Sequence, residues 1–94
     1  MPYIEPVARK ELDPLIDALF ARLNCQGLNM GNLNYTITRL VVKTFLLRGG
    51  YDTIAGVTGV LENVKQEFYR RAAVPYEFKK MVANGDIREY EVVE

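Results

Sequence analysis

The sequence predicts an all-α fold: a small bundle of three main helices plus a short C-terminal helix, followed by an irregular or edge-strand tail. Three stretches carry apolar residues three and four positions apart, which is typical of amphipathic helices. Segments rich in glycine and asparagine separate them, and no interdomain linker or internal repeat is present. We therefore expect a single helical domain over residues 1–94, with a core region over 1–86 and a tail over 87–94.

Length and composition limit how such a fold is stabilised. A chain of 94 residues buries only roughly 60 to 65% of the surface that its unfolded form exposes, so its core is expected to be thin. One cysteine cannot form an internal disulfide, and the absence of histidine removes the usual zinc ligands. Self-association is the natural remedy, and we expect a homo-oligomer, a dimer or higher.

Charge and hydropathy indicate the setting. Twelve basic and twelve acidic residues give a formal charge of zero, so neither nucleic acid nor a membrane is the expected partner. The first six residues have no signal-peptide pattern, and the longest apolar runs are too short to span a bilayer. We expect a cytoplasmic protein in which Cys25, with no histidine to activate it, is structural or incidental.

The first predicted helix has an apolar stripe that runs from Leu12 to Leu23. Proline is tolerated in the first turn of a helix but not in its interior. We therefore expect Asp13 to cap a helix that begins at Pro14 and ends near Asn24, with residues 6–12 forming a separate turn.

The second predicted helix covers residues 33–47 and follows a loop over residues 25–32. Its β-branched residues favour a strand, but a patterned run of about 16 residues is long for a strand and ordinary for a helix. Gly49 and Gly50 close it. Two interpretations of the pair Asn34 and Tyr35 stay open: a helix cap with a packing tyrosine, or part of a binding pocket.

The third predicted helix opens with Asp52 as its N-cap and carries a coiled-coil-like seam, with apolar residues at spacings of 3, 4, 3 and 4. The seam consists of Ile54, Val57, Leu61, Val64 and Phe68. Gly56 and Gly59 lie beside it, and such small residues let another backbone approach closely. We expect this surface to be the oligomer contact.

The last part of the chain is expected to be broken by Pro75. A proline disfavours helical geometry at the residue before it, so the third helix should stop or kink at Val74. A short helix over residues 75–83 should then end with Gly85 at its C′ position. The tail from Ile87 onward has no clear period, and an edge strand, an arm on a partner or an unordered end are equally consistent with it.

One cluster of aromatic and charged residues is the candidate ligand site. Its members are Glu62, Tyr69, Arg70, Arg71, Tyr76 and Lys79. Arginine forks and tyrosine rings suit phosphate and base recognition, which points to an anionic small molecule or a nucleotide. Glu67, however, lies three and four residues before the two arginines, the spacing of ion pairs on a solvated helix face. Both interpretations stay open.

Catalytic patterns are missing. No Walker loop, nucleophile elbow, dinucleotide fingerprint or metal-binding signature is present, and Asp13 and Asp17 are four apart without further acidic partners. We expect neither an enzyme nor a cofactor or metal site.

Six strings in this order resemble a family of short uncharacterised proteins from bacteria and tailed phages: MPYI (1–4), LNYTITRL (33–40), GVLE (59–62), EFYRR (67–71), PYE (75–77) and NGD (84–86). The resemblance covers about residues 1–87. It implies a bacterial or phage setting, hence the host cytoplasm for a phage protein, and no catalytic residues. The chain departs from the family pattern in the loop 26–31, at Phe78 and after Ile87.

Together these features predict a non-catalytic, homo-oligomeric binding or adaptor protein of phage or bacterial origin. The alternative is a phage-type nucleotide-sequestering protein that uses Tyr69, Arg70, Arg71 and Tyr76. A third hypothesis is an accessory subunit of a nucleotide-processing enzyme.

Overall fold

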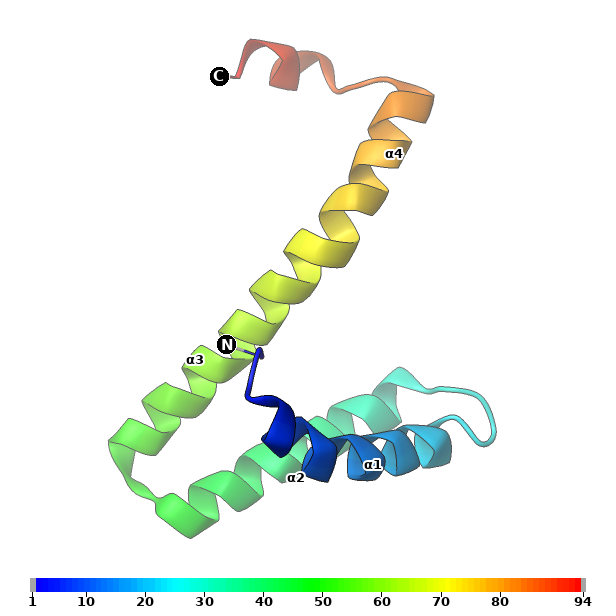
Figure 1. Ribbon diagram of the computed structural model, residues 1–94. Helices are drawn as coiled ribbons and strands as arrows, with labels where there is room; N and C mark the ends of the chain where they lie inside the picture. The colour runs from blue at the N-terminus through cyan, green and yellow to red at the C-terminus, as the bar shows by residue number, and fades with distance from the viewer. Residues whose placement is uncertain (1, 94) are drawn as a thin grey trace. The chain divides into compact units, whose positions relative to one another are not determined.

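The computed structural model describes residues 2–93, and all regular structure in them is helical (Figure 1). The elements are α1 (Pro6–Leu23), α2 (Met30–Arg48), α3 (Gly50–Phe68), the π helix η1 (Tyr69–Ala73), α4 (Val74–Asn84) and the 3₁₀ helix η2 (Arg88–Val92). The predicted all-α class is confirmed. The chain forms two compact units, Met1–Val60 and Leu61–Glu94.

Helix α1 begins eight residues before the predicted start. Pro6, rather than Pro14, occupies the first turn, and Pro14 lies inside the helix, so the predicted cap at Asp13 and the separate turn over 6–12 are wrong. Pro6 presets the backbone angle of the first helical position, and the Arg9 side chain donates to the carbonyl of Ile4 at 2.9 Å. Residues 9–22 are exposed, so the carbonyl that loses its donor at Pro14 is open to water.

Helix α2 confirms the prediction of a helix rather than a strand. Its β-branched residues fit because Thr36 and Thr44 donate their hydroxyls to carbonyls one turn earlier, at 2.9 and 2.8 Å. The N-cap is Asn29, whose side chain accepts from the backbone N–H of Asn32 at 3.1 Å. The cap predicted at Asn34 is therefore wrong, because the helix begins at Met30.

Replacing Asn29 by alanine is expected to lower the free energy of unfolding by about 1 kcal/mol, since one backbone donor of the first turn loses its acceptor. Urea denaturation followed by circular dichroism measures this change. Asn29→Ser is the control and should keep most of the stability, because serine caps helices about as well. An unchanged free energy of unfolding in Asn29→Ala would mean that the cap contributes nothing.

The corner between α2 and α3 is made by glycine. Gly49 ends α2 with a φ of 66°, and Gly50 opens α3 with a φ of 81°, so two successive residues occupy the left-handed region. The glycine stop predicted here is confirmed. Asp52 lies in the first turn of α3, where its negative charge interacts favourably with the helix dipole. The prediction that Asp52 is the N-cap is wrong, because the helix begins at Gly50.

Helix α3 does not stop at Val74. The backbone passes through η1 into α4 without a break, and the Val74 N–H donates to the carbonyl of Tyr69, five residues earlier. Pro75 explains this geometry. Proline has no backbone N–H to donate in an α-helix, and its ring would clash with the carbonyl four residues earlier. The irregularity expected from Pro75 thus takes the form of a π helix one turn earlier.

The C-terminal elements follow partly as predicted. Gly85 ends α4 with a φ of 88°, as expected for a C′ glycine. The described tail is not a strand: Arg88–Val92 form η2, and the Ile87 N–H donates to the Asp86 carboxylate at 2.7 Å. An edge strand here is therefore wrong.

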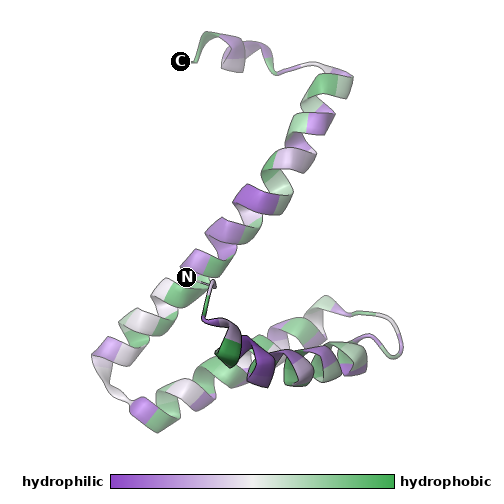
Figure 2. Ribbon diagram, viewed as in Figure 1, coloured by the Kyte–Doolittle hydropathy of each residue, from purple (hydrophilic) through white to green (hydrophobic). Residues whose placement is uncertain are grey.

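Apolar side chains in the described chain have no core to enter. Thr53, 7% exposed, is the single buried residue among residues 2–93, whereas Leu47 is 86% exposed. Hydrophobic and hydrophilic residues alternate along α1 and α2 (Figure 2), as amphipathic helices require, yet the hydrophobic faces stay accessible.

Two further observations bear on the setting. No helix in residues 2–93 is both long and apolar enough to cross a membrane. Cys25, just after α1, is exposed.

Candidate functional site

The candidate cluster predicted from sequence lies where α3 passes through η1 into α4. Hydrophilic residues gather along this stretch of the helix (Figure 2), and its contacts fall within the second unit. Five of the six candidates fall into four local groups, each with its own partners, and Lys79 belongs to none of them.

Arg70 and Arg71 share one carboxylate. A terminal nitrogen of Arg70 pairs with one oxygen of Glu67, and a nitrogen of Arg71 lies 3.8 Å from the other oxygen. Glu67 is only 24% exposed, while the two arginine side chains are 70% and 67% exposed. The predicted spacing thus produces an ion-pair group in which both arginines face one carboxylate.

Tyr69 is bound to Glu77 across the π helix. Its hydroxyl donates to the Glu77 carboxylate, with distances of 3.2 and 3.3 Å to the two oxygens. In a continuous α-helix two residues eight apart point about 80° away from each other. The extra residue in the turn of η1 removes that offset and brings the two side chains into line.

This contact raises the pKa of Tyr69. The negative charge of Glu77 is the largest cause, and the hydrogen bond to the same carboxylate adds to it. The phenol therefore stays neutral at pH values where an ordinary tyrosine has begun to ionise.

We expect the Tyr69 phenol to titrate above its ordinary pKa of about 10 and to return toward that value in Glu77→Gln. Because the pKa is raised in the folded state, the stability that the contact contributes is present below pH 10 and is lost as the pH rises through the folded pKa. NMR of ring-labelled tyrosine, assigned with Tyr69→Phe, measures the titration. An unchanged pKa in Glu77→Gln would contradict the contact.

The remaining candidates have partners of their own. Glu62 accepts from the Gln66 amide at 3.2 Å and pairs with Lys65 at 3.4 Å, and these two contacts, in that order, lower the pKa of Glu62. The Lys80 ammonium lies 5.7 Å from the centroid of the Tyr76 ring, a cation–π distance. Lys79 makes none of these contacts, so the six candidates do not converge on one pocket.

Sequence reasoning missed a groove between α4 and the tail. It is lined by Val74, Phe78 and Met81 of α4 and by Ile87 and Tyr90 of the tail, with Glu77, Lys80, Asn84, Gly85 and Asp86 completing it, and has a volume of about 510 Å³. We call it the α4–tail groove. The spacing of 4 and 3 between the three α4 residues was its signal in the sequence, but a 3₁₀ helix in the tail was not expected.

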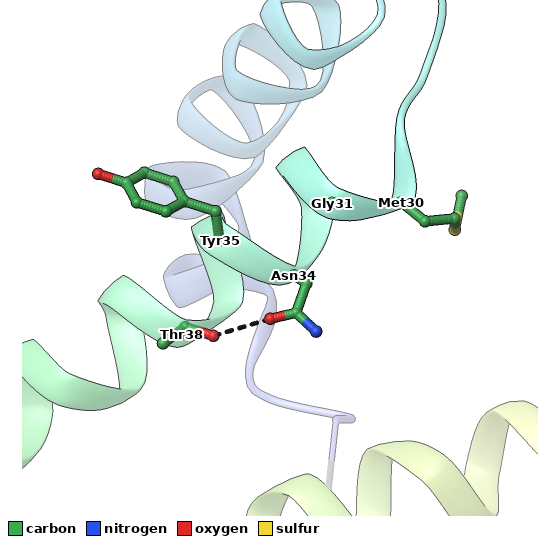
Figure 3. Close-up of a pocket in the computed structure, with 5 residues that line it drawn as sticks. All are labelled: Met30, Gly31, Asn34, Tyr35 and Thr38. Carbon is green, nitrogen blue, oxygen red and sulfur yellow. Dashed lines mark hydrogen bonds between the residues drawn. The ribbon is translucent and has the colours of Figure 1, made fainter.

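A second hollow lies at the start of α2. It is lined by Met30, Gly31, Asn34, Tyr35 and Thr38. The Thr38 hydroxyl donates to the Asn34 amide oxygen at 3.0 Å, and the Tyr35 ring points away from that pair (Figure 3). Tyr35 is exposed and does not pack as the capping interpretation required. Polar groups therefore do not converge here, as a ligand site would need.

In residues 2–93 no group of three or more histidine, cysteine, aspartate or glutamate side chains could hold a metal ion. No curated protein and no solved structure matches the chain. A family described as a domain of unknown function, DUF6899, matches residues 1–87, so the chain belongs to that family.

Proposed function

We propose that this protein is a non-catalytic adaptor of bacterial or phage origin that works in the cytoplasm as a homo-oligomer. The observation that carries the proposal is the exposure of its apolar helix faces. Among the described residues no apolar side chain is buried, although 49% of the residues in the sequence are hydrophobic. Exposed apolar faces mark interaction surfaces, and a second copy of the same chain is a partner that is always present.

The candidate cluster favours an adaptor over an enzyme. Its carboxylates are engaged by neighbouring amide, amine, guanidinium and phenol groups on the same helix, as the Glu62 and Glu67 contacts illustrate. The geometry is that of a helix surface stabilised by local pairs.

Nucleotide or anion sequestration is the second candidate function. One observation favours it: the guanidinium groups of Arg70 and Arg71 meet at the carboxylate of Glu67, and both arginine side chains are largely exposed. Arginine forks bind phosphate groups through paired hydrogen bonds.

Native mass spectrometry of the full chain, with static light scattering as the solution check, tests the first proposal. We expect an oligomer without a bound small molecule. Val64→Glu should shift the assembly toward smaller species, because a charge would be buried in the contact, whereas the neighbouring Asn63→Glu should not. A folded monomer at all concentrations would overturn the proposal.

A nucleotide-sized mass on the oligomer would support the second candidate function instead. Arg71→Ala should then abolish binding while circular dichroism stays unchanged. Loss of folding in that variant would make the arginine structural and count against sequestration.

A further inference from the structure

The α4–tail groove lies within the second unit, and both of its walls come from one short stretch of chain. One wall is the apolar side of α4, formed by Val74, Phe78 and Met81, and the other carries Ile87 and Tyr90 of the tail. Phe78 is 60% exposed and Tyr90 is 63% exposed. The groove of about 510 Å³ is therefore open at the surface and has room for the apolar part of a small molecule.

Two carboxylates belong to the lining of this groove. Glu77 accepts from the Tyr69 hydroxyl, with distances of 3.2 and 3.3 Å to its two oxygens, and Asp86 accepts from the backbone N–H of Ile87 at 2.7 Å. Both donors are neutral groups, so neither contact neutralises a carboxylate. Within residues 2–93 no cationic side chain forms an ion pair with Glu77 or Asp86.

The lysine of the lining directs its charge elsewhere. The Lys80 ammonium lies 5.7 Å from the centroid of the Tyr76 ring, and Tyr76 does not line the groove. Counting 100° per residue, Tyr76 points roughly 170° away from the mean direction of the apolar α4 wall. The cation–π contact thus draws the ammonium toward the other side of α4, and Lys80 contributes mainly the carbons of its side chain to the groove.

The tail adds an aromatic ring close to the acidic groups. The raised pKa of Tyr69 is caused chiefly by Glu77, and an electrostatic interaction with Tyr90 adds a smaller contribution, so the Tyr90 phenol lies near the contact between Tyr69 and Glu77. Carboxylates accept hydrogen bonds from ammonium ions, and the faces of aromatic rings attract cations. The groove therefore combines apolar walls with groups that bind a positive charge.

We propose that the α4–tail groove binds a small organic ammonium ion that carries an apolar, preferably aromatic, group. The apolar group packs between the α4 wall and Tyr90, and the ammonium donates to the carboxylates of the lining, Glu77 and Asp86. Charge complementarity selects this ligand, because the two carboxylates repel an anion and stay unpaired beside a neutral hydrocarbon. The predicted seam of α3 does not line the groove, so this site is independent of self-association.

An NMR titration of the full chain tests the proposal with three probes that share one phenyl ring: phenethylammonium, phenethyl alcohol and hydrocinnamate. We expect phenethylammonium to shift the backbone amides of Phe78, Met81 and Tyr90 saturably. The alcohol should bind at least about tenfold more weakly, because it cannot form a charge-assisted hydrogen bond, and hydrocinnamate should not bind. Equal dissociation constants for the ammonium ion and the alcohol, or no saturable shift with the ammonium ion, would overturn the proposal.

Variants that remove charge locate the ammonium group. Asp86→Asn keeps an oxygen for the Ile87 N–H, and Glu77→Gln keeps one for Tyr69, so both preserve the local contacts. The two changes together should raise the dissociation constant of phenethylammonium at least about tenfold. Glu91→Gln is the matched control, because it removes an acidic group of η2 that does not line the groove, and it should bind like the wild type. Equal affinities in the double variant and the control would contradict the site.

A salt series on the wild-type chain checks the site even if the double variant fails to fold. Added sodium chloride screens the carboxylates and should weaken phenethylammonium binding while the affinity for the alcohol stays constant. Ammonium binding that does not depend on salt would overturn the proposal. The mass of the assembly is a separate measurement, so failure here leaves the proposed adaptor function standing.

Discussion

A chain that lacks Ala72 is expected to titrate Tyr69 near its ordinary pKa of about 10. Deleting one residue from η1 leaves an ordinary α-helical turn, which rotates α4 by about 100° relative to α3. The Tyr69 hydroxyl then no longer reaches Glu77, so the cause of the raised pKa is lost. NMR of labelled tyrosine measures the effect.

Two controls make this deletion interpretable. An ordinary α-helical turn would bring the Pro75 ring against a carbonyl, at a cost of about 3 kcal/mol, so the deletion should be made in a Pro75→Ala background. Deletion of Gln26, in the turn after α1, removes one residue outside every helix and should leave the Tyr69 pKa unchanged. A Tyr69 pKa that stays raised in the Ala72 deletion would show that the contact with Glu77 does not depend on the π turn.

Thermal unfolding of the wild-type protein is expected to depend strongly on protein concentration. If chains fold only as they associate, a 100-fold dilution lowers the free energy of unfolding by at least about 2.7 kcal/mol per mole of assembly. The midpoint temperature measured by circular dichroism should fall accordingly. A midpoint that stays constant over that range would show that each chain is stable alone.

The matched comparison for this prediction is Val64→Glu. It weakens the α3 seam, so its midpoint should be lower than that of the wild type at every concentration, whereas Asn63→Glu should follow the wild-type curve. Parallel shifts in both variants would indicate a loss of helix stability instead of a loss of association.

The helices could be predicted from the sequence because apolar spacing along a helix is a local property. The residues at which the helices begin and end were harder to predict. Pro14 predicts a helix start because prolines are rare in helix interiors, but α1 continues through it. Asn29 precedes the apolar stripe and therefore predicts a loop, although its side chain caps α2.

The contacts of the candidate site divide in the same way. Glu67 pairs with both arginines at spacings that any helix aligns, so that group was predictable. The contact between Tyr69 and Glu77 was not predictable, because two residues eight apart align only after a π turn. Pro75 predicts an irregular turn but does not specify that it is a π helix. The α4–tail groove depends on the position of Ile87 and Tyr90 relative to α4. The tail sequence has no clear period and does not predict that position.

The two successive left-handed glycines between α2 and α3 have a stereochemical consequence. At Gly49, with φ 66° and ψ 175°, the mirror-image backbone lies at the edge of the extended region that ordinary residues favour. A D-alanine installed there by chemical ligation would have a favoured backbone conformation and would restrict the unfolded chain, whereas L-alanine would be strained. The corner is thus a position at which the handedness of one added methyl group decides whether it stabilises or weakens the protein.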